Sequence, residues 1–204
     1  MEISFYNEFK RKAVHLFALS IPIGYFFLPR PLSLLILSPF VLGAVVIDIV
    51  RLRKLPLHGF LNQLLGPILR DHEDTDFAGS SYILSASFLS ILLYDKSVAV
   101  MAITFIILGD IAAALIGRRF GKIRFTFSWG RGDALRNSRK SLEGSLACLF
   151  VCLVAAVLIP HIPLWVGLIG AVVATVVEGI NLPINDNFSV PLLSGLCMQL
   201  LLKI

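Results

Sequence analysis

The strongest constraint on this chain is the gathering of its apolar residues into long runs. Proline, glycine and charged residues divide the sequence into seven apolar segments, at residues 13–28, 32–50, 80–94, 97–116, 142–159, 164–180 and 189–202. A helix needs about 20 residues to cross the hydrocarbon core of a bilayer, with a working range of about 17–25. The segments therefore predict an all-α polytopic membrane bundle of about seven transmembrane helices. Six is the alternative, because the first, third and last segments are short.

Composition supports this fold class. Apolar residues make up 57% of the 204 residues and charged residues 15%, whereas soluble domains contain about 45–50% and about 25%. We expect a single membrane-embedded domain over residues 1–204, since no soluble domain or convincing repeat interrupts the segments. Cys148, Cys152 and Cys197 lie inside apolar runs without a CxxC spacing, so neither a disulfide framework nor a zinc site is indicated.

Basic residues are distributed unequally between the two ends of the predicted spans. The chain has 18 Lys and Arg residues, and all but Arg30, Lys96 and Lys203 lie before the first span, between the second and third, or between the fourth and fifth. The positive-inside rule therefore predicts a cytoplasmic N-terminus. This orientation accounts for the net charge of +5 without a nucleic acid partner.

Ionisable residues gather at or near the predicted cytoplasmic ends of the helices: Glu8, Lys12, His15, Asp48, Arg51, Asp110, Glu143, Glu178 and Asp186. Such residues are costly at membrane depth and usually serve a site. A transporter more often places them near the midplane, at broken helices. Their one-sided placement favours an enzyme that acts on a lipid headgroup with a soluble cytosolic cosubstrate.

Glycines around the end of the fourth predicted span suit either of two structures. Gly117 and Gly121 would permit a phosphate to approach the backbone closely, and the same spacing suits a helix-packing face. The basic side chains of Arg118, Arg119 and Lys140 would add positive charge to a phosphate site. The sequence has neither a Walker A loop nor a kinase glycine loop that follows a strand.

Four carboxylates are candidate magnesium ligands: Asp110, Glu143, Glu178 and Asp186. Mg²⁺ is commonly held by one or two carboxylates together with substrate phosphates. Glu178 and Asp186 bracket a link that contains no Lys or Arg, so this negative patch would either bind a metal ion or face the basic loop. Asp110, Lys140, Glu143 and Asp186 are the candidate catalytic residues, and we expect them to share one site.

Two shorter patterns lie at the start of the first segment and the end of the second. Lys12 and His15 are three residues apart and share a helix face, which suits either an interfacial anchor or part of a site. Asp48 and Arg51 have the i,i+3 spacing of a helix-end ion pair.

The order of these patterns resembles that of the CTP-dependent lipid alcohol kinases, which include dolichol kinase, phytol and farnesol kinases and CTP-dependent diacylglycerol kinase. The matching elements are Glu8…Arg11-Lys12…His15, Asp48…Arg51, Arg70…Glu73, Gly79-Ser80-Ser81-Tyr82, Gly109-Asp110…Gly117…Gly121, Lys140-Ser141-Leu142-Glu143-Gly144 and Glu178…Asp186-Asn187…Pro191. The resemblance implies a catalytic domain that moves the γ-phosphoryl group of CTP to a lipid hydroxyl, with Mg²⁺, at the cytoplasmic face. It also implies nucleotide contacts from Lys12, His15, Arg51, Gly109, Gly117, Arg118, Arg119, Gly121, Lys140, Ser141, Gly144 and Asn187.

Two alternatives remain open. The Gly-Asp and Lys-Ser-x-Glu-Gly elements are also similar to those of CTP:phosphatidate cytidylyltransferase, which makes a CDP-lipid, but that enzyme's Pro-Gly-His-Gly-Gly-type tail is missing. A small ion-coupled transporter or a scaffolding membrane protein is the alternative from another class. The sequence does not separate a polyprenol, a phytol-like alcohol and diacylglycerol as the lipid substrate.

Overall fold

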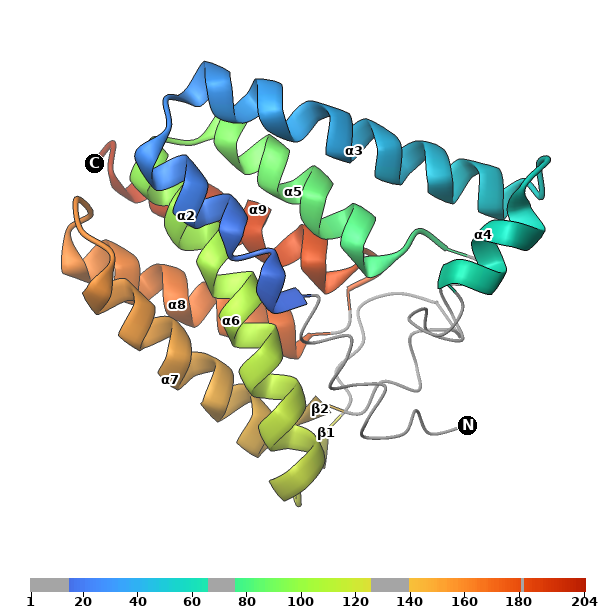
Figure 1. Cartoon of the computed structure of the whole chain (residues 1–204). Coiled ribbons are helices and arrows are strands. Elements are labelled where there is room, and N and C mark those ends of the chain that lie inside the picture. Colours follow the sequence, from blue (N-terminus) through green and yellow to red (C-terminus); the bar gives the residue numbers. More distant parts are fainter. Residues whose placement is uncertain (1–14, 66–75, 126–139, 181) are drawn as a thin grey trace.

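The computed structural model describes residues 15–65, 76–125, 140–180 and 182–204 and shows a bundle of helices with one short pair of strands (Figure 1). The helices are α2 (Ser20–Phe27), α3 (Arg30–Leu52), α4 (His58–Leu65), α5 (Gly79–Leu93), α6 (Lys96–Phe120), α7 (Leu142–Leu158), α8 (Leu164–Gly179) and α9 (Asp186–Leu201). The strands β1 (Arg124–Phe125) and β2 (Lys140–Ser141) pair antiparallel. The predominantly helical fold is the one that the sequence predicts.

Local sequence explains where several helices begin. Pro29 and Pro31 flank the first residue of α3, where the fixed φ of proline suits a helix start and its missing N–H is not needed. The Ser141 hydroxyl accepts a hydrogen bond from the Gly144 N–H at 3.1 Å and caps α7. Asn185 caps α9 in the same way. These caps fix the two helix starts that bear most directly on the site.

Each of the seven predicted apolar segments overlaps one helix, namely α2, α3 and α5–α9, although α2 covers only about half of the predicted segment 13–28. Two of these helices, α3 with 23 residues and α6 with 25, are long and apolar enough to cross a membrane among the residues that the structure describes. The others are shorter, so the number of spans stays a prediction. Helix α4 and the β1–β2 pair were not predicted from the sequence.

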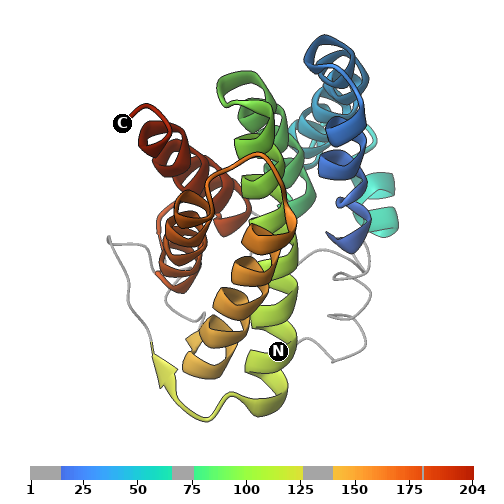
Figure 2. The same cartoon turned by 90° about the vertical axis from the view of Figure 1, so that its left-hand side faces the viewer.

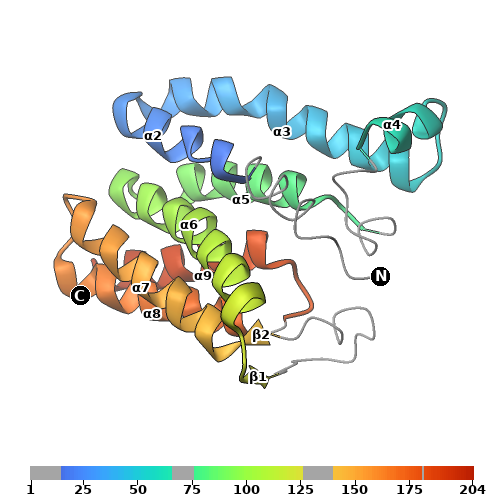
Figure 3. The ribbon, with the colours of Figure 1, turned by 60° about the horizontal axis from the view of Figure 1, so that its bottom comes forward.

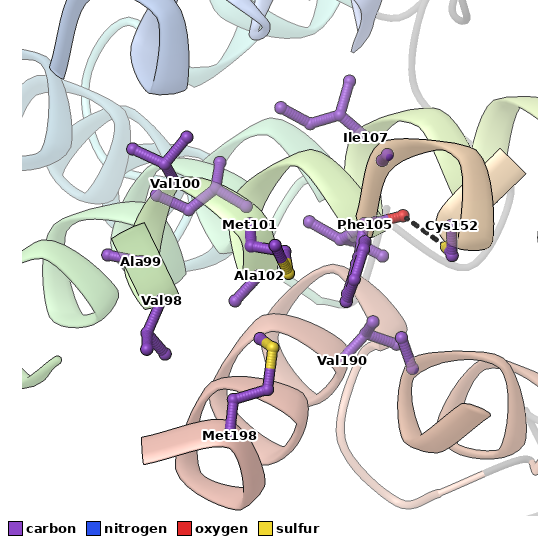
Figure 4. Packing of buried hydrophobic residues seen from close by; sticks show 14 of the residues in the cluster. Val98, Ala99, Val100, Met101, Ala102, Phe105, Ile107, Cys152, Val190 and Met198 are labelled. Carbon is purple, nitrogen blue, oxygen red and sulfur yellow. Dashed lines mark hydrogen bonds between the residues drawn. The ribbon is translucent and has the colours of Figure 1, made fainter. Parts of the chain in front are cut away.

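The helices form three layers around α6. Helices α2 and α3 lie on one side of α5 and α6, and α7, α8 and α9 lie on the other (Figure 3). Helix α6 is the core element: Val98, Ala99, Met101, Ala102 and Ile103 are fully buried. They pack with neighbours that include Phe105, Cys152, Val190 and Met198 (Figure 4). The position of Asp110 is therefore fixed by the most tightly packed helix of the bundle.

The outer faces of the bundle are apolar and exposed. Phe40 on α3, Phe150 and Leu158 on α7, and Leu164 and Trp165 on α8 each have more than half of their surface exposed. Only 17% of the most apolar window of α3 is buried, against 50% for α6. Extended exposed apolar surface is unusual for a protein in water and typical of one that contacts lipid. The structure thus supports a membrane protein.

Arg30 and Lys96, the first residues of α3 and α6, donate hydrogen bonds to the C-terminal ends of other helices. Arg30 Nη2 donates to the Tyr94 carbonyl at 2.5 Å, and Lys96 Nζ donates to the Leu28 carbonyl at 3.1 Å. Leu28 and Tyr94 are the residues that end α2 and α5, where backbone carbonyls lack helical partners. Positive charge at a helix C-terminus also complements the helix dipole. These two residues therefore have structural partners.

Candidate active site

Lys140 lies between two carboxylates that come from different helices. Its Nζ atom is 2.6 Å from Oε1 of Glu178, at the end of α8, and 2.7 Å from Oδ2 of Asp186, at the start of α9. The side chains of Lys140, Glu178 and Asp186 are 16%, 5% and 30% exposed. Burial by itself would lower the pKa of Lys140, but Asp186 and Glu178 outweigh burial and raise it. Lys140 is thus a fixed positive charge.

The chain reaches this arrangement through the short strand pair. Phe125 pairs with Lys140 and Arg124 pairs with Ser141, so Lys140 is held in extended backbone directly before α7. Asp186 occupies the first turn of α9, where the helix dipole stabilises a negative charge. One ammonium therefore joins β2, α8 and α9.

Glu143 has a different set of partners. Its Oε1 atom accepts hydrogen bonds from the Lys122 N–H at 3.0 Å and the Ile123 N–H at 3.2 Å. Its Oε2 atom is buried and has no hydrogen-bond partner among the described residues. Glu143 therefore holds the turn that follows α6, and one of its oxygens remains available to a ligand.

Asp110 makes contact with the N-terminal part of the chain. Its Oδ2 atom lies 3.4 Å from Nε2 of His15, and the two side chains are 20% and 11% exposed. The charge of Asp110 also interacts with that of Glu178. Asp110 therefore lies near the Lys140 site and joins α6 to the residues before α2.

Helices α6 and α7 pack against each other (Figure 2), and Gly117, Gly121 and Gly144 of the predicted phosphate site lie at this contact. A Cβ atom on Gly117 would lie 2.7 Å from Ser141 Oγ, and one on Gly144 would lie 2.7 Å from the Ala113 carbonyl oxygen. A Cβ atom on Gly121 would lie 2.8 Å from Ser141 Cβ. These contacts are closer than a side chain tolerates, so the spacing serves helix packing. A role in phosphate binding stays a prediction for these glycines and for Ser141.

Gly109 also faces neighbouring side chains, since a Cβ atom on it would lie 2.8 Å from Cys148 Sγ and 3.2 Å from Cys152 Sγ. Arg118 and Arg119 are exposed in the last turn of α6, where a nucleotide in solution can reach them. Lys12 lies outside the described residues.

Arg51 and Asn187 bind the segment that leads into α5. Arg51 Nη2 lies 3.0 Å from Asp48 Oδ1 and donates to the Asp76 carbonyl at 2.7 Å. Asn187 Nδ2 donates to the Gly79 carbonyl at 3.1 Å. The structure therefore gives both predicted nucleotide ligands structural partners, and a nucleotide contact for either stays a prediction.

The described residues contain no group of three or more His, Cys, Asp or Glu side chains that could hold a metal ion. Two observations nevertheless fit a magnesium ion that is held partly by substrate. Glu178 and Asp186 share one ammonium, and Glu178 Oε2 is buried without a hydrogen-bond partner in the described part of the chain. Since Mg²⁺ takes one or two carboxylates plus phosphates, Glu178 and Asp186 fit best among the four candidates.

The sequence does not single out Ser145 at this end of the bundle, and it does not predict the contacts that Asp48 and Tyr82 make with the start of α5. Ser145 Oγ is buried, lacks a hydrogen-bond partner within the described ranges and lies against Gly179. Asp48 Oδ2 accepts a hydrogen bond from the Ala78 N–H at 3.0 Å, and the Tyr82 hydroxyl donates to Asp76 Oδ1 at 2.8 Å. Tyr82 and Asp48 belong to elements that carry the family resemblance, which was the available signal.

Comparison with known proteins finds distant relatives. An uncharacterized protein of Rickettsia prowazekii is 27% identical over 195 residues, which cover 91% of this chain and 90% of that protein. CTP-dependent diacylglycerol kinase 1 of Eremothecium gossypii is 26% identical over 189 residues, covering 79% of this chain and 57% of the relative. The kinase of the same name from Saccharomyces cerevisiae is 27% identical over 183 residues, covering 78% and 60%.

No protein-family model matches the chain, and no solved structure matches it significantly. The chain spans somewhat more than half the length of the two fungal kinases. Its similarity to them is distant but extends over most of this chain, and it supports the CTP-dependent lipid kinase family in broad terms.

Proposed function

We propose that this protein is a multi-pass membrane kinase that transfers the γ-phosphoryl group of CTP to the hydroxyl of a membrane lipid. Diacylglycerol is the first lipid to test, because it is named in the fungal relatives. A polyprenol such as dolichol and a phytol-like alcohol are the other acceptors of this kind. The active site would lie at the cytoplasmic face, with the N-terminus on the same side.

One observation carries the proposal: Lys140, a mostly buried ammonium, is held by two carboxylates from separate helices at one end of the bundle. Phosphoryl transfer needs mainly positioning and neutralisation of charge on the transferred group. In this proposal Lys140 contacts a phosphate oxygen of CTP, and the exposed Arg118 and Arg119 attract the nucleotide. Glu178 and Asp186 would hold Mg²⁺, which neutralises phosphate charge when bound.

In the proposed reaction, one bond forms, one bond breaks, and a side chain of this site accepts the proton. A new bond forms between the lipid hydroxyl oxygen and the γ-phosphorus of CTP. The bond between that phosphorus and the bridging oxygen breaks, and CDP leaves with the electron pair. The proton of the hydroxyl passes to the pair formed by His15 and Asp110, whose facing atoms are 3.4 Å apart.

The origin of the transferred phosphorus tests this proposal against its nearest alternative. Purified protein with Mg²⁺ and lipid is given CTP that is labelled at either the α or the γ phosphorus. A kinase moves the γ label into the lipid fraction, and a cytidylyltransferase moves the α label. Diacylglycerol, a polyprenol and phytol are supplied separately as acceptors, with phosphatidate for the second reaction. Transfer of neither label to any lipid would leave the transporter or scaffold as the better account.

A further inference from the structure

The buried ion pair of Asp48 and Arg51 lies at the end of α3, and neither residue contacts Lys140, Glu178 or Asp186 in any described interaction. The two side chains are each 2% exposed, with Asp48 Oδ1 and Arg51 Nη2 3.0 Å apart. Both oxygens of Asp48 are engaged, since Oδ2 accepts from the Ala78 N–H at 3.0 Å. A buried ion pair is weak evidence of a purely stabilising role, because an apolar pair is often at least as stable.

The ion pair also contacts the residues directly before α5. Arg51 Nη2 donates to the Asp76 carbonyl at 2.7 Å, and the Tyr82 hydroxyl donates to Asp76 Oδ1 at 2.8 Å. Ala78 is the residue that precedes the first turn of α5. The ion pair therefore fixes the backbone of residues 76–78 from one side and the start of α5 with it.

The start of α5 in turn contacts the start of α9. Helix α5 lies between α3 and α9 (Figure 1). Asn187 Nδ2 donates to the Gly79 carbonyl at 3.1 Å, and the rings of Tyr82 and Phe188 meet edge to face with centroids 6.2 Å apart. Asn187 is the neighbour of Asp186, whose Oδ2 atom accepts from Lys140 Nζ at 2.7 Å.

We infer that Asp48 and Arg51 are positioning residues, which set the place of Asp186 on Lys140 through the starts of α5 and α9. This inference rests on the proposed function, because it assigns the ion pair a task in that site. Asp48 lies 138 positions from Asp186 in the sequence. Two hydrogen bonds link them, from the Ala78 N–H to Asp48 and from Asn187 to the Gly79 carbonyl, because Ala78 adjoins Gly79 and Asn187 adjoins Asp186. A small misplacement of an active-site group costs up to about 100-fold in rate, so the link would act mainly on kcat.

The first test is a double-mutant cycle between the two ends of the link. Asp48→Asn leaves an acceptor for Ala78 but loses the charge that Arg51 pairs with, and Asn187→Ala removes the contact with Gly79. Each variant should lower kcat by about 10- to 100-fold, with the KM for CTP close to that of the unchanged protein. The double variant should lose about as much kcat as the more damaging of the two single variants and no more, because both substitutions break one link. Additive losses overturn the inference.

A matched control exists at the other end of α9. Gln199 Oε1 accepts from the Asp95 N–H at 2.7 Å, and Gln199 Nε2 donates to Asp95 Oδ2 at 2.8 Å. Gln199→Ala therefore removes a comparable contact between α9 and a helix start without touching the proposed link. It should leave kcat unchanged, and its effects on stability should add to those of Asp48→Asn. A loss of kcat in Gln199→Ala equal to that in Asn187→Ala also contradicts the inference.

A milder variant tests the same link if Asp48→Asn does not fold. Tyr82→Phe removes only the bond to Asp76, and it should lower kcat by about two- to tenfold, the value of one hydrogen bond. Unchanged kcat in Tyr82→Phe, if Asp48→Asn does not fold, overturns the inference.

Hydrogen exchange separates failure of the inference from failure of the proposed function. The amides of Phe188 and Ser189 donate to the Asn185 carbonyl at 2.9 and 3.0 Å. In Asp48→Asn, and in Tyr82→Phe to a smaller degree, these amides should exchange faster than in the unchanged protein. The amide of Leu202, at the far end of α9, should not. Unchanged exchange at the start of α9 contradicts the link whatever the enzyme's activity. If the protein without substitutions shows no kinase activity, that result contradicts only the proposed function.

Discussion

Lys140 Nζ lies 2.6 Å from Glu178 Oε1, although 38 positions separate the two residues in the sequence. Glu178 is nearly buried, with 5% of its side chain exposed. An unpaired carboxylate at such a place is unfavourable, so Lys140 and Glu178 depend on each other in the folded protein. The same ammonium carries the proposed role in catalysis, and the two roles must be separated by experiment.

Paired substitutions separate them. Lys140→Met leaves Glu178 without its cation and should lower thermal stability in detergent, by up to about 3–5 kcal/mol if the carboxylate stays charged. It should also abolish lipid phosphorylation, since a charge-assisted phosphate contact is lost. Addition of Glu178→Gln should restore much of the stability but none of the activity, because the more buried of the two carboxylates beside Lys140 is then uncharged. Thermal denaturation and phosphorylation rates measured on the same preparations check both expectations. Recovery of activity together with stability would mean that the pair only supports the fold.

The pKa of Lys140 predicts a pH dependence. Burial lowers this pKa, but the charges of Asp186 and Glu178 raise it above its ordinary value. A group whose pKa is raised by folding stabilises the folded state fully below its unfolded pKa, of about 10.4. That contribution is lost only as the pH rises through the folded value. The stability difference between the unchanged protein and Lys140→Met should therefore not shrink from about pH 7 to about pH 9. A difference that shrinks within this range, measured by thermal denaturation, would contradict the raised pKa.

Alanine substitution should lower stability at Gly144, where α6 and α7 pack together, but not at Gly43 in α3. Gly144→Ala places a Cβ atom 2.7 Å from the Ala113 carbonyl oxygen, and nothing lies within 4 Å of a Cβ atom on Gly43 in α3. Gly144→Ala should therefore lower stability by about 1–3 kcal/mol, the usual cost of overpacking, while Gly43→Ala should not lower it. Thermal denaturation of both variants is the measurement. If Gly144 instead bound phosphate without a packing role, its variant would keep its stability and show a raised KM for CTP.

The predicted orientation in the membrane can be tested by labelling. The native residues Cys148, Cys152 and Cys197 are first replaced by alanine, and single cysteines are then placed at Arg131 and His161. Because basic residues concentrate in the predicted cytoplasmic loops, an impermeant thiol reagent should reach the two positions from opposite faces of sealed vesicles. Labelling of both positions from the same face would contradict the seven-span topology.

The sequence predicts the seven apolar helices well, because length, apolar content and breaks at proline, glycine or charge are local signals. Helix α4 was missed because Pro56 and Gly59 interrupt a short segment that lacks an apolar run. The β1–β2 pair was missed because it is two residues long on each side, and its pairing partner is not a local property.

The sequence anticipates some of the contacts in the candidate site, and the function of that site stays a prediction. Lys140, Glu178 and Asp186 were expected to share a site, and the structure brings these three together. Glu143 was expected there too, but its Oε1 atom binds the backbone of residues 122–123. Composition could not reveal this contact, because the partners are backbone N–H groups exposed by the way the chain turns after α6. Arg51 has the predicted helix-end pair with Asp48, whereas its burial depends on tertiary packing.

The fate of the γ-phosphorus of CTP is the most direct test of the proposed kinase activity. Unchanged protein and the variant Asp186→Asn are incubated with CTP labelled at the γ position, Mg²⁺ and diacylglycerol. Label should enter the lipid with the unchanged protein, and CDP should accumulate in equal amount. Asp186→Asn should remain folded and transfer at most about 1% as fast, because the carboxylate beside Lys140 loses its charge. Release of pyrophosphate would contradict the proposed kinase reaction, and transfer by Asp186→Asn at the rate of the unchanged protein would contradict the proposed site.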